Sequence, residues 1–247
     1  MSATPQLQGT SATLTEPGLG AELTLLGGFQ LRVGGRVVSL PLPPQRLLAF
    51  LALQNRPLLR PYVAGALWPE ASESRAAGNL RSALWRLSQT SEPLIVAGRH
   101  LQLDPAVGVD VRIGTELALR LRTSSHVDSD DLTAEHLSFD LLPDWYEDWV
   151  VLARESFTQL RVHALELLCR QLAAQRHYDA AVQAGLAAVA ADSLRESAHR
   201  SLIEAYLAEG NAGPALRQYE AFCKVLSDEL GLEPSRQLQE LAFSIGH

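Results

Sequence analysis

Two contrasting helical faces are encoded in the segment SESRAAGNLRSALWRL, residues 72–87. At roughly 100° per residue, its apolar side chains fall within about 60° of Leu80 and make one continuous stripe. Ser72 or Ser74 can accept hydrogen bonds from the free amides of the first turn, and Glu73 favours the positive end of the helix dipole. The segment therefore predicts a helix that packs one face on a core and leaves the other free.

The opposite face of this helix carries side chains suited to the major groove of DNA. They are Arg75, Asn79, Ser82, Trp85 and Arg86. Arginine can pair bidentately with guanine and asparagine with adenine, while serine can reach a base or a phosphate. A plain solvated face is the alternative interpretation. An exposed Trp85 between arginines is unusual for such a face, although the indole could also lie half buried under a strand.

Short strands and helices are predicted on both sides of this segment. Paired glycines separate strand-like runs at residues 23–26, 29–33 and 37–40, and apolar spacing predicts helices over 44–55 and 60–67. Beyond the segment, residues 94–97 and 100–103 read as a hairpin that turns at Gly98-Arg99. This order is typical of an OmpR-type winged helix-turn-helix domain, which we assign to residues 21–105.

Further basic side chains of this domain are candidate DNA contacts. Arg99 and His100 lie at the tip of the hairpin and could enter the minor groove, although an ordinary polar turn would look the same. Arginines elsewhere could contact phosphates, which adds affinity without sequence information. These predicted phosphate contacts are Arg46, Arg56, Arg60 and Arg81.

The second half of the chain, residues 106–247, is predicted to be helical after a linker loop at about 123–140. An offset of 34 residues aligns Leu168 with Leu202 and Ala181 with Ala215. That period is typical of tetratricopeptide-like helix pairs, which must stack on a neighbour to cover their apolar faces. Because there are only two copies, we expect a long helix before them to supply the missing partner. The fold class is mainly α with a small β component.

Charge is distributed unevenly between the two halves. The chain carries a net charge of −7, but residues 21–122 hold twelve arginines against seven acidic residues, and residues 123–247 hold nine basic against twenty acidic ones. The first half can attract phosphate while the second repels it.

Several classes of protein are disfavoured by the sequence. It has no apolar run of membrane length and no secretory signal, so we expect a cytoplasmic protein with a flexible tail over residues 1–20. Phosphate-binding glycine loops, nucleophile elbows and paired metal-binding histidines are missing from it. We therefore predict no enzyme activity, catalytic residue, cofactor or metal.

Several motifs resemble the Streptomyces antibiotic regulatory protein family. QRLLAFL at 45–51, ALWP at 66–69 and NLRSALWRL at 79–87 resemble its winged helix, while LPDWYEDW at 142–149 and ELGLEPS at 229–235 resemble its bacterial transcriptional activation domain. The resemblance implies a winged helix followed by three tetratricopeptide-like helix pairs. It also implies an activator that binds promoter repeats on double-stranded DNA and recruits RNA polymerase.

Two functions remain open from the sequence. The first is the DNA-binding transcription regulator, acting as a homodimer or tandem array because one such module reads few base pairs. The alternative is a helical-repeat adaptor or ligand sensor whose winged helix contacts only proteins.

Overall fold

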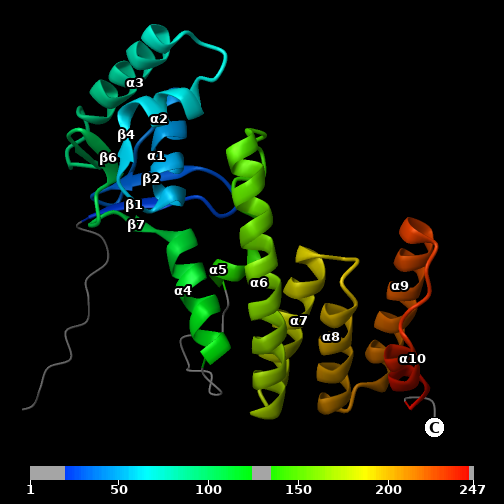
Figure 1. Cartoon of the computed structure of the whole chain (residues 1–247). Helices are drawn as coiled ribbons and strands as arrows, with labels where there is room; N and C mark the ends of the chain where they lie inside the picture. The colour runs from blue at the N-terminus through cyan, green and yellow to red at the C-terminus, as the bar shows by residue number, and fades with distance from the viewer. Residues whose placement is uncertain (1–19, 124–134, 245–247) are drawn as a thin grey trace, which may run out of the picture.

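The computed structural model describes residues 20–123 and 135–244, in which a β-containing first half leads into a row of helices (Figure 1). The first sheet has the order β3-β2-β1-β7 and contains β1 (Ala21–Thr24), β2 (Gln30–Val33), β3 (Arg36–Val37) and β7 (Gly108–Val109). The second has the order β4-β6-β5 and contains β4 (Leu58–Leu59), β5 (Ile95–Ala97) and β6 (His100–Leu103). In sequence, α1 (Leu42–Gln54) precedes β4, and α2 (Arg60–Leu67) and α3 (Glu73–Leu87) lie between β4 and β5.

The remaining helices build the second half. They are α4 (Asp110–Thr123), α5 (Glu135–Ser138), α6 (Asp148–Ala174), α7 (Tyr178–Ala191), α8 (Glu196–Glu209), α9 (Ala212–Leu230) and α10 (Arg236–Phe243). One apolar core joins the sheets and α1–α3 to the start of α6, a second lies among α4, α6, α7 and α8, and a third lies among α8, α9 and α10. The predicted fold class is thus confirmed.

The predicted elements of the first half form, with small shifts of their ends. The helix predicted over 60–67 has these bounds as α2, whereas the one predicted over 44–55 begins earlier, at Leu42. The third strand was predicted to reach Leu40 but ends at Val37. The amide of Val38 still donates to the Leu31 carbonyl at 2.8 Å, and Pro41, which has no amide to donate, limits the strand beyond it.

Hydrogen bonds from backbone amides tie the first half to the second. The carboxylate of Asp110, at the start of α4, accepts the amides of Leu25 at 2.9 Å and Leu26 at 2.9 Å. Leu142 then donates its amide to the Leu25 carbonyl at 2.9 Å, and Gly27 donates to the Asp140 carbonyl at 2.8 Å. The domain boundary predicted after residue 105 stays a prediction. Strand β7 follows this boundary in sequence, although it pairs in parallel with β1 of the first half.

The 34-residue repeat is visible in the helices. Leu168 and Leu202 are both fully buried, as are Ala181 and Ala215. The turns correspond as well, because His177 directly precedes α7 and Asn211 directly precedes α9.

Three expectations for the second half were wrong in detail. The long helix α6 does not precede the first repeat but contains its first helix, and the additional packing partner is α4, which was not predicted. Part of the predicted linker is the short helix α5, whose Leu137 is fully buried. Within the described residues the helix pairs are α6/α7 and α8/α9, with α10 following them in place of a full third pair. The predicted tail and the linker segment 124–134 lie outside the described residues, apart from Gly20.

A left-handed residue at the end of α6 gives a stability prediction. Arg176 has a φ of +63°, and the equivalent position after α8 is Gly210 with a φ of +90°. Because a side chain is strained in this region and glycine is not, we expect Arg176→Gly to raise the free energy of unfolding by about 0.5 to 1 kcal/mol. Urea denaturation measures the change. Gly210→Ala is the matched control and should lower stability; a loss from both substitutions would contradict the explanation.

Candidate nucleic-acid interface

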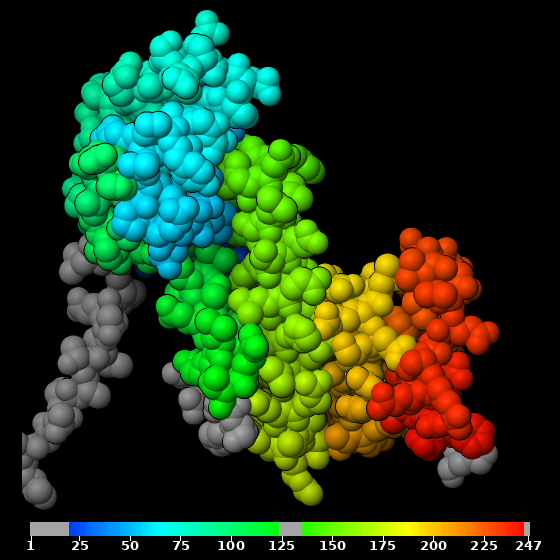
Figure 2. Space-filling view, viewed as in Figure 1, coloured from blue at the N-terminus to red at the C-terminus, as the bar shows by residue number. Residues whose placement is uncertain are grey.

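Helix α3 lies at the end of the molecule farthest from α7–α10 (Figures 1 and 2). Its Ala76, Leu80, Ala83 and Leu87 are buried in the first core. The neighbouring helices that hold it are α2 and α1. The outer face of α3 is therefore left uncovered by the second half of the chain.

The predicted recognition residues line this outer face. Arg75, Ser82, Trp85 and Arg86 are exposed, while Asn79 is half-buried. Asn79, Ser82 and Arg86 border a depression of about 320 Å³ against the prolines at the start of α1. Trp85 lies nearer the other edge of the helix, next to the β5–β6 hairpin.

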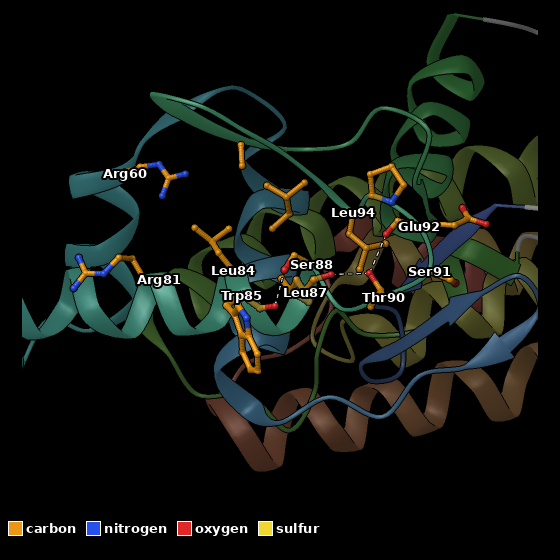
Figure 3. Close-up of a pocket in the computed structure, with 13 residues that line it drawn as sticks. Arg60, Arg81, Leu84, Trp85, Leu87, Ser88, Thr90, Ser91, Glu92 and Leu94 are labelled. Atoms are coloured by element: carbon orange, nitrogen blue, oxygen red, sulfur yellow. Dashed lines mark hydrogen bonds between the residues drawn. The ribbon is translucent and has the colours of Figure 1, made fainter.

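An open groove of about 540 Å³ runs between α3 and the β5–β6 hairpin (Figure 3). The leucines that line it are Leu84 and Leu87 of α3 and Leu94, which directly precedes β5. Arg60 and Arg81 lie at one end of the groove, and Thr90 and Glu92 lie at the other. Two guanidinium groups at the mouth of a groove beside an exposed helix suit a phosphate backbone.

The hairpin is held against the helices by Arg60. Its Nε donates to the carbonyl of Gly98, in the hairpin turn, at 2.7 Å. Arg99 and His100, which follow, are exposed. Arg60 thus positions the predicted wing, a role that the sequence did not reveal.

Two more of the predicted phosphate contacts, besides Arg60, interact with other side chains. Arg46 forms an ion pair with Glu147 across the junction of the two halves, with 2.8 Å between Nε and Oε1, although the angle is not that of a hydrogen bond. Part of its charge is thus already paired within the protein, and a phosphate contact by Arg46 stays a prediction. Arg56 is exposed, with its guanidinium carbon 6.0 Å from the centre of the Tyr62 ring.

The ends of α3 also differ from expectation. Ser72 occupies the N-cap position, but its hydroxyl makes no capping bond and instead lies 3.4 Å from the hydroxyl of Ser74. At the other end, Ser88 donates its hydroxyl to the Trp85 carbonyl at 2.8 Å and Gln89 donates its amide to the same oxygen at 3.4 Å. These bonds satisfy a carbonyl that the helix leaves without a partner and fix its last turn.

The aromatic motif LPDWYEDW forms the junction between the halves. Trp145 stacks on Phe29 with ring centroids 5.9 Å apart, and Trp149 meets Phe50 edge to face at 5.2 Å. Arg154 donates to the carbonyls of Leu141 and Trp145 at 2.7 and 2.6 Å, which fixes the segment before α6. The winged helix and the helical half are thus joined by packing as well as by the chain.

Comparison with known proteins assigns the second half. Residues 136–245 match the family model of the bacterial transcriptional activator domain. The second half of the chain therefore contains a bacterial transcriptional activator domain. The segment LPDWYEDW, residues 142–149, lies within the matched range and forms the junction described above.

A solved structure is similar in fold to this chain. Mycobacterium tuberculosis EmbR, solved in complex with a low affinity phosphopeptide, matches with a TM-score of 0.63 and 23% identity over 91% of this chain. The match spans 64% of the EmbR chain. No curated protein matches at a significant level.

Two kinds of feature were not found in the described residues. Within residues 20–123 and 135–244, helices with the length and apolarity needed to cross a bilayer do not occur. The same ranges contain no cluster of three or more side chains that could hold a metal ion.

Proposed function

We propose that this protein is a cytoplasmic, sequence-specific transcription activator that inserts α3 into the major groove of double-stranded DNA. The observation that supports the proposal most directly is the uncovered outer face of α3, where Arg75, Ser82 and Arg86 are exposed. The hairpin groove beside it, with Arg60 and Arg81 at its mouth, fits the adjacent phosphates. Arg99 and His100 would reach the minor groove.

The helical half is proposed to contact RNA polymerase. Its net charge is opposite to that of the winged helix, so it would not compete for the phosphates that the winged helix binds. The protein would bind promoter repeats as a homodimer or a tandem array, since a single module covers few base pairs.

A binding experiment tests the DNA contact. Genomic fragments retained by the purified protein are sequenced, and the affinity for an enriched site is measured against salt. We expect log K to fall linearly with log salt concentration, with a slope of about −0.9 for each phosphate contacted. Absence of any enriched fragment would contradict the proposal and favour the protein-binding adaptor.

Substitutions on α3 test which side chains read the bases. We expect Arg86→Ala and Arg75→Ala each to weaken binding to the enriched site by about 1 to 3 kcal/mol and to relax the preference for it, because each removes a bidentate donor. Arg236→Ala, at a 91% exposed side chain on the distant α10, is the matched control and should leave affinity unchanged. Equal losses from α3 and α10 would count against base reading by α3.

A further inference from the structure

Trp85 is the one large apolar side chain of α3 that is exposed, at 63%. Trp85 borders the hairpin groove, but its ring points to the opposite side of α3 from Leu84 (Figure 3). Its neighbours on the outer face, Ser82 and Arg86, are polar. Because an indole is large and mostly apolar, covering it with a binding partner would remove a large apolar area from water and favour binding.

Among the described residues, no ring-stacking or cation–π contact is recorded for Trp85, and those that occur involve other aromatic side chains. The backbone of Trp85 is nevertheless fixed, because its carbonyl accepts from both Ser88 and Gln89. The backbone from which the ring projects is therefore held in place.

We propose that Trp85 determines specificity by covering the C5-methyl group of thymine in the major groove. This inference rests on the proposed function. An adenine–thymine pair differs from a guanine–cytosine pair in the groove partly through that methyl group, which apolar side chains contact. Asn79, six residues earlier on the same helix, offers the amide that pairs with adenine. The polar side chains would thus read hydrogen-bonding edges, while Trp85 reads an apolar feature that they cannot.

Removing single methyl groups from the DNA tests this role. A random duplex library is selected with the full-length protein, and each thymine of the enriched site is replaced in turn by deoxyuridine, which lacks only the methyl group. For the wild type we expect one or two positions at which affinity falls about fourfold, the factor for burying one such group. With Trp85→Ala the same replacements should have no effect.

A matched control tests whether the loss of any exposed apolar side chain would change the response to deoxyuridine. Leu152→Ala removes a side chain that is 66% exposed on α6, and it should keep the wild-type response to deoxyuridine. An enriched site whose affinity is insensitive to every replacement would overturn the role of Trp85 while leaving DNA binding intact. A Trp85→Ala variant that keeps the thymine dependence would do the same. Failure to enrich any sequence would overturn both proposals.

Discussion

Trp149→Ala should lower the free energy of unfolding by about 3 kcal/mol, toward the lower end of the range for truncating a packed tryptophan. Trp149 lies at the junction of the halves, edge to face with Phe50 and again with Trp145, whose centroid is 6.2 Å away. Phe50 is 1% exposed, so the lost ring leaves a cavity against a core that cannot easily collapse. Denaturation in urea, followed by circular dichroism, measures the change.

Tyr146 is the natural control, because it belongs to the same aromatic motif but is 81% exposed. Its replacement by alanine should change stability by no more than about 0.5 kcal/mol. Similar losses from the two substitutions would show that the motif does not act through packing at the junction. An unfolding curve that splits into two transitions for Trp149→Ala alone would support the junction as the source of cooperativity between the halves.

The sequence predicted the local elements of the winged helix well, since each has its own periodic signal. Helix α2 and the repeat positions Leu168 and Leu202 are examples in which spacing alone was enough. Helix α4 was missed even though Val111, Leu117 and Leu121 are buried at helical spacing. Gly114 weakens that signal, and the structure shows why glycine is there: a Cβ would lie 2.7 Å from the His136 carbonyl oxygen.

The candidate site could be predicted only in part. The polar face of α3 follows from periodicity, so the exposure of Arg75 and Arg86 was foreseeable. The partners of Arg46 and Arg60 were not, because Glu147 and Gly98 lie far from them in sequence and meet them only through the fold. A surface arginine in a sequence does not reveal whether its charge is free or already paired.

Arg195→Ala should destabilise the helical half by about 3 kcal/mol, because it leaves a buried carboxylate without its cation. Glu166, on α6, has a side chain only 5% exposed, and its Oε1 lies 2.8 Å from Arg195 Nε. The hydroxyl of Ser197 also donates to this oxygen, at 2.6 Å. These contacts join α6 to the start of α8, so the substitution should affect how the repeats stack.

A double-mutant cycle distinguishes a lost ion pair from lost packing. If the stranded charge of Glu166 causes the damage, Glu166→Gln combined with Arg195→Ala should be more stable than Arg195→Ala alone, since the remaining amide costs less to bury. The exposed pair of Arg236 and Glu240, also 2.8 Å apart, provides the comparison, and breaking it should cost at most about 0.5 kcal/mol. Equal costs at the two sites would mean that water reaches Glu166 when Arg195 is removed. Burial of the carboxylate, rather than the length of the ion pair, therefore decides the size of the effect.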